Sequence, residues 1–191
     1  MSLISCYYKI IVLKNNTTEE YKAVIKVCKE LFLKKTKDYG TAWRILRLSS
    51  ITDQIYIKAQ RIRSIQEKGT QLVADDINGE FIGIINYCII ALMQLDLTET
   101  DLMEIPFEEV ETLYEKHYQE TFNLLLAKNH DYGEAWREMR VSSITDIVLM
   151  KLFRVKQIED NQGKTIVSEG VGANYQDMIN YSVFALIKLT L

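Results

Sequence analysis

Asp131-Tyr-Gly-Glu-Ala-Trp136, followed by Arg140 and by Ser142-Ser-Ile-Thr-Asp146, is the stretch that explains most of this chain of 191 residues. It matters because the chain contains it twice. The earlier copy lies 93 residues before the later one (131 minus 38) and consists of Asp38-Tyr-Gly-Thr-Ala-Trp43, Arg47 and Ser49-Ser-Ile-Thr-Asp53. A repeat that keeps polar as well as apolar residues predicts two structurally equivalent units.

The repeat continues beyond this stretch. Lys58-x-x-Arg61 matches Lys151-x-x-Arg154, and Asn86-Tyr87 matches Asn180-Tyr181 with one inserted residue between them. Apolar residues recur at helical spacing in each copy, and the chain has only 8 Gly and one Pro. A helical period with few helix breakers predicts long helices rather than many short strands.

Three helices are expected in each copy. In the first, Thr17-x-x-Glu20 has the pattern of a capping box, which predicts a helix that ends just before Asp38. Ser50-x-x-Asp53 predicts the start of a second helix, which Gly69 ends. A third helix, over about residues 80–95, is apolar nearly all round and is therefore expected to be buried.

The two other helices of one copy cannot cover such a helix. We therefore expect an all-α protein, in which two three-helix repeats interlock about a pseudo-twofold axis into one helical bundle. The repeats are expected to span residues 17–97 and 106–191, and Pro106 opens the second after a linker of residues 98–105. Residues 1–16 lie outside the repeat, and the pattern does not choose between a strand and a tail.

The composition excludes several classes of protein. The net charge is −3, the pI is about 5.5 and the basic residues are scattered, so no direct nucleic-acid surface is expected. Three cysteines without metal-ligand spacing indicate reduced thiols and a cytoplasmic location. The apolar run near the N-terminus is too short for a signal peptide or a membrane span, so no membrane partner is expected. The sequence also allows a homodimer.

Basic residues recur at fixed spacing on and before the second helix of each repeat. Those three positions apart share a helix face, and they are candidates for two phosphate-binding pockets because the guanidinium fork fits phosphate oxygens. The alternative is a solvated helix face whose cations form ion pairs. The six candidates are Lys58, Arg61 and Arg47 in the first repeat, and Lys151, Arg154 and Arg140 in the second.

Two amides stand inside the apolar third helices. A buried amide costs a few kcal/mol unless its hydrogen bonds are made. Asn86 and Asn180 therefore either tie this helix to the Asp-Tyr-Gly loop or recognise the edge of a base or sugar. Trp136 is a further candidate for nucleotide binding, by stacking on a base, although Trp and Tyr in this motif are as readily anchors of the core or of the loop.

The candidate catalytic pair is Asp131 with His130. Asp131 lies at a predicted helix end, where a carboxylate can accept loop amides, hold a divalent cation or pair with an arginine. His130 next to it is suited to acid–base or metal chemistry. The chain's other histidine, His117, falls on an apolar stripe and is expected in the core. Asp53 and Asp146 are expected to cap their helices.

These motifs resemble one family. Lys128-Asn-His-Asp-Tyr-Gly-x-Ala-Trp136, Ser-Ser-Ile-Thr-Asp, Lys-x-x-Arg and the closing Ile-Asn-Tyr are similar to those of the nucleotide-modification-associated domain 1 family, over about residues 20–95 and 108–190. The resemblance implies an all-α domain that is associated with the modification of nucleotides or of DNA bases.

More distantly, the layout is similar to the MazG-like all-α nucleoside triphosphate pyrophosphohydrolases. That resemblance implies a Mg²⁺ cofactor held by acids, one pair of which is spaced Glu-x-x-Asp on the third helix. Each repeat keeps half of this pair, because Glu80 is followed by Gly83 and Asp177 is preceded by Asn174. The candidate magnesium ligands are Asp131, Asp177, Glu111 and Glu115.

The sequence thus supports two hypotheses from different classes. The leading one is a nucleotide-binding protein of nucleotide or DNA-base-modification metabolism, whose enzymatic form is a Mg²⁺-dependent pyrophosphohydrolase. The other is a non-catalytic helical module for interaction or oligomerisation, in which the repeated polar side chains are bonded to one another.

Overall fold

The computed structural model describes residues 16–72, 76–97, 103–167 and 169–190, and these contain no strand. The expected all-α fold is confirmed. The nature of residues 1–15 and of linker residues 98–102 lies outside the described part of the chain. The helices are α1 (Thr17–Tyr39), η1 (Ala42–Ile45), α2 (Leu48–Lys68), α3 (Ile77–Asp96), α4 (Phe107–Tyr132), η2 (Ala135–Glu138), α5 (Val141–Asp160) and α6 (Val171–Thr190).

The helices begin close to the predicted positions, but other residues cap them. The side chain of Asn16, and not that of Thr17, accepts a hydrogen bond from the backbone N–H of Glu19 at 3.3 Å and caps α1. α2 begins two residues before the predicted Ser50. Asp76 caps α3 and accepts from a backbone N–H at 2.9 Å.

Glycine explains one part of the repeated motif. α1 and α4 end at Gly40 and Gly133, which have φ 62° with ψ −146° and φ 62° with ψ −152°. Residues with a β-carbon rarely adopt this backbone conformation. The chain can therefore turn from the long helix into the short 3-10 helix only where the motif supplies glycine.

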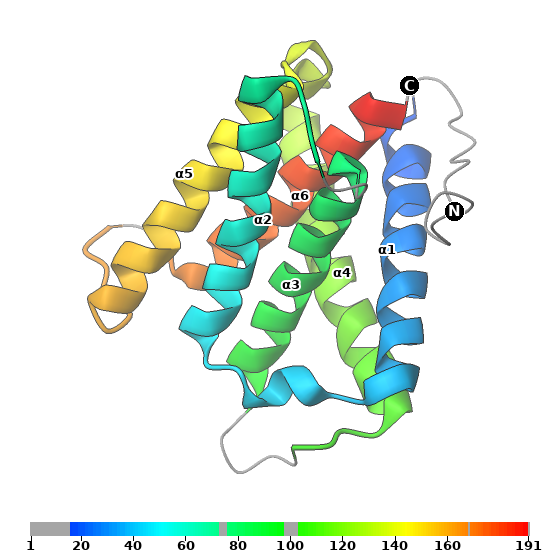
Figure 1. The fold of residues 1–191 in the computed structure, drawn as a ribbon, viewed down its shortest axis with the longest axis vertical. Coiled ribbons are helices and arrows are strands. Elements are labelled where there is room, and N and C mark those ends of the chain that lie inside the picture. The colour runs from blue at the N-terminus through cyan, green and yellow to red at the C-terminus, as the bar shows by residue number, and fades with distance from the viewer. Residues whose placement is uncertain (1–15, 73–75, 98–102, 168, 191) are drawn as a thin grey trace.

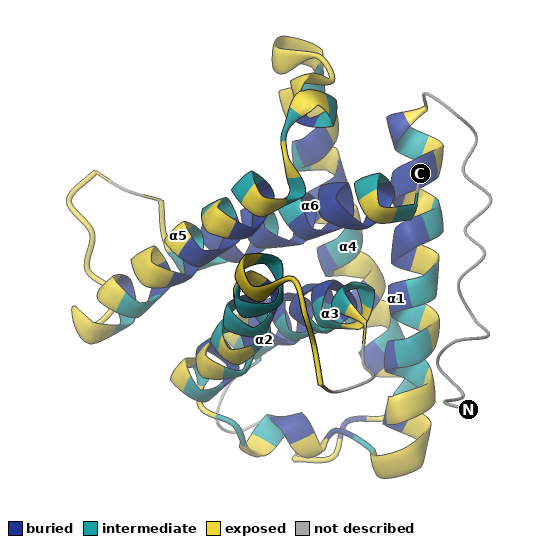
Figure 2. Cartoon of the chain, turned by 45° about the horizontal axis from the view of Figure 1, so that its top comes forward, coloured by how far each residue is buried: buried dark blue, intermediate teal, exposed yellow. Residues whose placement is uncertain are grey.

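The core lies where α3 and α6 pack against each other. Figure 2 shows dark blue, buried surface concentrated on these two helices and on the inner faces of their neighbours. α3 is long and apolar enough to cross a membrane, with a mean hydropathy of 1.3, but 56% of that window is buried within the protein. Its fully buried side chains include Phe81, Ile84, Ile85 and Ile89. The position of α3 is that of a core helix covered by other helices.

The two repeats pack against each other along their second and third helices. α2 contacts α5, and α3 contacts α6, while α1 of the first repeat also contacts α6 of the second. In Figure 1 the two copies cross at the centre of the molecule and do not lie as separate bodies. This arrangement agrees with the predicted interlocking of two repeats in one bundle.

Equivalent tyrosines and asparagines bond across the repeats in a reciprocal way. The hydroxyl of Tyr21 on α1 donates to Oδ1 of Asn180 on α6 at 2.8 Å. The hydroxyl of Tyr114 on α4 donates to Oδ1 of Asn86 on α3 at 3.0 Å. Each third-helix amide is thus bonded to the first helix of the other repeat, which is the relation expected of a pseudo-twofold axis.

The Ser-Ser-Ile-Thr-Asp motif forms a second reciprocal joint, between α2 and α5. Its threonine bonds a side chain of the other repeat: Thr52 donates to Glu159 at 2.8 Å, and Thr145 accepts from Gln66 at 3.1 Å. Its aspartate pairs with a cation of the other repeat: Asp53 with Lys156 at 2.5 Å and Asp146 with Arg63 at 3.8 Å. The expectation that these aspartates cap helices is wrong, because both lie inside the second helix and face the neighbouring one.

Candidate functional site

The first repeat gathers two cations around one carboxylate. Lys58 Nζ lies 3.2 Å from Glu80 Oε2, and Arg61 pairs with Glu80 Oε1. Glu80 is 12% exposed, while the two cations remain about a quarter exposed. The Lys58 ammonium also lies 5.9 Å from the centre of the Tyr87 ring. Two cations thus share one carboxylate in this cluster.

The second repeat has the same charge balance but a different arrangement. Asp177 receives Lys151 at 2.5 Å and Lys128 at 2.6 Å, one on each carboxylate oxygen. Burial raises the pKa of Asp177, but the hydrogen bonds and charges of both lysines outweigh it and bring the pKa below its ordinary value. Arg154, the equivalent of Arg61, is exposed on α5 and does not join the cluster.

The split Glu-x-x-Asp pattern now has a physical explanation. Each repeat retains a single acid on its third helix, and that acid is paired with the lysine of Lys-x-x-Arg. Where the first repeat has Gly83 in place of Asp177, the stem of Lys58 crosses the helix so closely that an added β-carbon would lie 2.7 Å from its Cδ and Cε. Where the second repeat has Asn174 in place of Glu80, the amide bonds the carbonyl of Gly170 at 3.1 Å. In each repeat one position of the pattern thus holds an acid that forms an ion pair, and the other position holds a residue that packs against or bonds within the protein.

Arg47 and Arg140 do not join these clusters. Each precedes the first residue of its second helix and is exposed. Lys58 follows Arg47 by eleven positions, which corresponds to roughly 16 Å along a helix. The prediction that Arg47 and Arg140 complete two phosphate pockets is therefore not supported by the geometry.

The third-helix amides and the tryptophan make contacts inside the protein. The Oδ1 atoms of Asn86 and Asn180 accept the tyrosine hydroxyls described above, and Asn86 Nδ2 donates to the carbonyl of Cys28 at 3.1 Å. Trp136 is 5% exposed and stacks on Phe184 with 4.3 Å between ring centroids and 3° between planes. A base could reach neither Asn180 nor Trp136 without opening the core, so their assignment to nucleotide binding is corrected to an internal structural role. Asn86 is partly buried, and both of its side-chain atoms bond within the protein.

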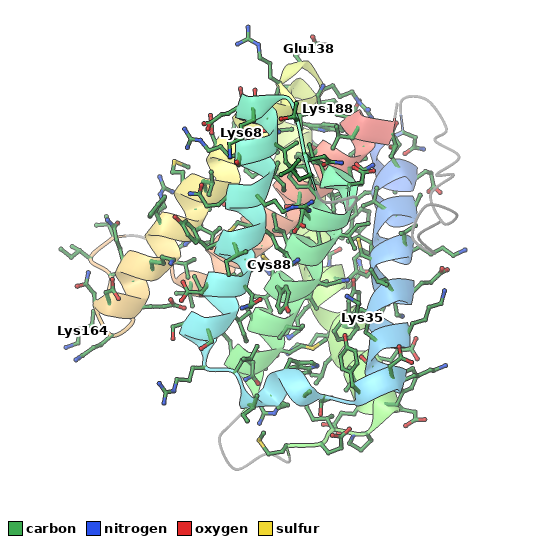
Figure 3. The ribbon with its side chains drawn as sticks, viewed as in Figure 1. Lys35, Lys68, Cys88, Glu138, Lys164 and Lys188 are labelled. Atoms are coloured by element: carbon green, nitrogen blue, oxygen red, sulfur yellow. The ribbon has the colours of Figure 1, made fainter. Side chains whose placement is uncertain are left out.

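The expected partners of the amides also differ. They bond across the repeats and not to the Asp-Tyr-Gly loop. The turn that carries the tryptophan is held by other side chains: Lys188 of α6 donates to the carbonyl of Arg137, and its equivalent Gln94 of α3 donates to the carbonyl of Leu46 at 2.9 Å. Figure 3 labels Lys188 and, close to it, Glu138 at the end of η2.

The Asp-Tyr positions of the motif lie on the surface. His130 Nδ1 and Asp131 Oδ1 are 3.1 Å apart, but these side chains are 88% and 73% exposed. This proposed catalytic pair is thus open to solvent, and no buried residue in the described part of the chain bonds to either side chain. Tyr39 is 58% exposed, and burial, Tyr87 and Asp38 together raise the pKa of its hydroxyl. Tyr39 therefore lies within electrostatic reach of Tyr87, beside the cluster of the first repeat.

The candidate magnesium ligands are not brought together. Glu111 and Glu115 pair with Lys29 at 3.1 and 2.9 Å, in an open groove of about 690 Å³ between α1 and α4. Asp177 is held by its two lysines, and Asp131 lies at the exposed end of α4. Among the described residues, no group of three or more His, Cys, Asp or Glu side chains is placed to hold a metal ion. The residues present do not fit the Mg²⁺ site that the resemblance implies, since lysines pair with Glu111, Glu115 and Asp177, and Asp131 lies apart from them.

Two further residues were missed from the sequence. Lys128 was quoted only as part of the family motif, yet it provides the second ammonium on Asp177. Arg137 donates to Glu20 at 2.5 Å and lies 4.4 Å from the centre of the Trp136 ring. Its equivalent Arg44 follows Trp43 in the other motif copy, so the repeated Trp-Arg pair was the available signal.

His117 lies in the core as predicted. Its side chain is 4% exposed, with Nε2 3.2 Å from Asp96 Oδ2, and burial lowers its pKa. This histidine stands at the position of Val24 in the first repeat, on the stripe that faces the other helices.

Comparison with known proteins identifies the family of this chain. The family model described as Nucleotide modification associated domain 1 matches residues 35–95 and 128–189, once in each repeat. No curated protein and no solved structure matches the chain. The two matched segments cover more than half of the sequence and contain both ion-pair clusters. The chain therefore belongs to the nucleotide modification associated domain 1 family.

Proposed function

We propose that this protein binds a phosphorylated nucleotide, in the metabolism of nucleotides or modified DNA bases. The observation that carries the proposal is the pair of clusters, each with two cations on one carboxylate, at equivalent places in the two repeats: Lys58 and Arg61 on Glu80, and Lys128 and Lys151 on Asp177. The family's description supplies the link to nucleotides.

Charge and exposure favour a phosphate group as the ligand. Each cluster holds two partly exposed cations at one carboxylate. A partly exposed cation pair attracts phosphate more strongly than it would in bulk water, because the surrounding protein lowers the local dielectric constant. A guanidinium and an ammonium side by side in the first repeat suit a phosphate with several oxygens.

Two tyrosines near the first-repeat cluster could contact a base. Tyr87 lies under the Lys58 ammonium, and Tyr39 is exposed within electrostatic reach of Tyr87. Exposed aromatic rings next to cations stack on nucleotide bases of any sequence. Tyr39 is therefore our candidate for contacting the base, in place of the buried Trp136.

Hydrolysis of the MazG-like kind is not part of this proposal. That likeness rests on the layout of the helices and on the split acid pattern. The chemistry needs a metal that bridges phosphate oxygens, and the acids that would hold it are neutralised by lysines or lie apart. The free, buried Cys28 and Cys88 are compatible with a cytoplasmic location, which we include in the proposal.

A second candidate function is a helical interaction module without a ligand. It is favoured by the cross-repeat bonds, since the threonine and aspartate of Ser-Ser-Ile-Thr-Asp and both third-helix asparagines join the repeats. The exposed Asp-Tyr positions and the two cation clusters are the repeated residues that this alternative leaves unexplained.

Thermal unfolding distinguishes the two candidates. The protein is heated with nucleoside and deoxynucleoside mono-, di- and triphosphates, each with Mg²⁺ and with a chelator. A nucleotide at 100 times its Kd should stabilise by about 2.7 kcal/mol, or about 5–10 °C for a chain of this size. We expect a shift that does not require Mg²⁺.

The test variant and its control change residues on the same helix, α2. The double substitution Lys58→Ala and Arg61→Ala should remove the nucleotide-induced shift. Lys68→Ala, an exposed lysine at the far end of α2, should leave it intact. No shift with any nucleotide would reject the proposal and favour the interaction module, whereas a shift that appears only with Mg²⁺ would reject its metal independence.

A further inference from the structure

The two clusters differ at one position, and the difference shows what the first cluster lacks. In the second repeat the Asp177 carboxylate accepts Lys151 from α5 and Lys128 from α4. Both lysines have equivalents in the first repeat, Lys58 on α2 and Lys35 on α1. The acid has none, because Gly83 occupies its position.

The first repeat keeps the cations that a carboxylate would bind there. Lys35 is exposed on the lower half of α1 in Figure 3 and pairs with no described residue. Lys58 lies across Gly83 and reaches forward to Glu80, which stands one helical turn earlier on α3. Glu80 retains Arg61 as a second partner, so Lys58 can leave it without stranding a buried charge.

We infer that a phosphate group of the ligand binds in the first repeat above Gly83, between Lys35 and Lys58, in the place that the Asp177 carboxylate occupies in the second repeat. Asp177 is then an internal substitute for the bound anion, and the second repeat is closed to ligand. This inference rests on the proposed function and specifies it: one phosphate site per chain, in the first repeat.

The comparison between the repeats explains why a phosphate would bind in the first repeat and not in the second. Asp177 is 9% exposed and both of its oxygens are taken, so a phosphate would have to displace a carboxylate that cannot leave the chain. Gly83 itself supplies no carboxylate, and the stem of Lys58, which lies over the glycine, would have to swing away from Glu80 to admit a phosphate. A carboxylate attached to the helix competes with a free anion within the same molecule, without the cost of bringing two molecules together.

Exchange of the two residues tests the inference. Inorganic pyrophosphate is the probe, and isothermal titration calorimetry gives both its affinity and its stoichiometry. The unchanged protein should bind one pyrophosphate. Gly83→Asp should weaken binding about tenfold or more, because the new carboxylate takes both lysines. Asp177→Gly should create a second site and bind two.

A matched control separates position from charge. Gly79→Asp also adds a carboxylate to α3, but at an exposed glycine where an added β-carbon meets nothing within 4 Å. It should keep one site with nearly unchanged affinity. The melting temperature of each variant without ligand reports folding, and the pair Gly83→Asp and Gly79→Asp decides the matter even if Asp177→Gly is unstable.

The outcomes also separate this inference from the proposed function. Two sites in the unchanged protein, or full binding by Gly83→Asp, would overturn the single site while leaving phosphate binding intact. Loss of binding in Gly79→Asp to the same extent as in Gly83→Asp would equally overturn it, because charge alone would then explain the effect. No binding of pyrophosphate or of any nucleotide by the unchanged protein would overturn both.

Discussion

Replacing Tyr21 by Phe removes one hydroxyl group at a place where its partner has no substitute. That hydroxyl donates to Asn180 Oδ1 at 2.8 Å in the buried interface between α1 and α6. Asn180 is 5% exposed, and its Nδ2 already has no hydrogen-bond partner. The variant would therefore leave both polar atoms of a buried amide unsatisfied.

The equivalent substitution in the other repeat should cost less. Tyr114→Phe removes the bond to Asn86 Oδ1, but Asn86 is only partly buried and keeps its bond to the carbonyl of Cys28. Leaving a buried acceptor unsatisfied costs about 1–3 kcal/mol, whereas a bond that water can replace contributes about 0.5–1.5 kcal/mol. With roughly 2–4 °C per kcal/mol for a chain of this size, Tyr21→Phe should lower the melting temperature by about 2–12 °C.

Urea denaturation followed by circular dichroism measures both variants, and a double variant checks the cause. Replacing both partners by apolar groups of similar shape is nearly neutral, so Tyr21→Phe with Asn180→Leu should recover most of the loss. Equal effects of Tyr21→Phe and Tyr114→Phe would refute the reasoning from burial. A double variant no more stable than Tyr21→Phe alone would show that the lost bond is not the cause.

Three further predictions concern other parts of the fold. Burial raises the pKa of Glu159 above its ordinary 4.5. The stability that Glu159 contributes is therefore complete below pH 4.5 and is lost as the pH rises through the raised pKa. Glu159→Gln places the amide of the equivalent residue, Gln66, at this position, and it should raise the melting temperature at pH 7 and remove that loss. The pKa of Asp177 is lowered, because its two lysines outweigh burial. The stability that Asp177 contributes is therefore present above pH 3.8 and is lost as the pH falls through the lowered pKa. Asp177→Asn should lower the melting temperature at pH 7 and reduce the fall of the melting temperature at acid pH. Gly133→Ala should cost about 1–3 kcal/mol in urea denaturation because of its backbone angles, whereas Gly79→Ala, within α3, should be neutral or stabilising.

The fold could be predicted from the sequence because few arrangements of helices bury an apolar helix on all sides. A third helix that is apolar nearly all round must be covered, and a repeated copy supplies the cover. The caps were harder to predict, because neighbouring residues of similar chemistry compete for the same backbone N–H groups. Asn16 caps α1 in place of Thr17, whose hydroxyl instead donates to Glu134 in the other repeat.

The candidate site was predicted only in part, for a reason that lies in the symmetry. Aligning two copies compares each residue with its equivalent but does not show which residue it contacts, and several of the repeated residues bond to the other copy. Asp53 aligns with Asp146 and yet binds Lys156. The cations Lys58, Arg61 and Lys151 were found because both copies share them in one short motif. Lys128 also has an equivalent, Lys35, but its pairing with Asp177 could be predicted only from how α4 approaches α6.

Joining both repeats in one polypeptide has a genetic consequence. In a homodimer of single repeats, every substitution appears on both sides of the axis, so an acid that closes one phosphate site would close the other as well. In this chain Gly83 and Asp177 are separate codons. With the phosphate site inferred above, one half is free to become a permanently filled copy that supports the bundle, while the other half keeps an open site. A single point mutation in either codon would then change the number of ligands that the molecule carries.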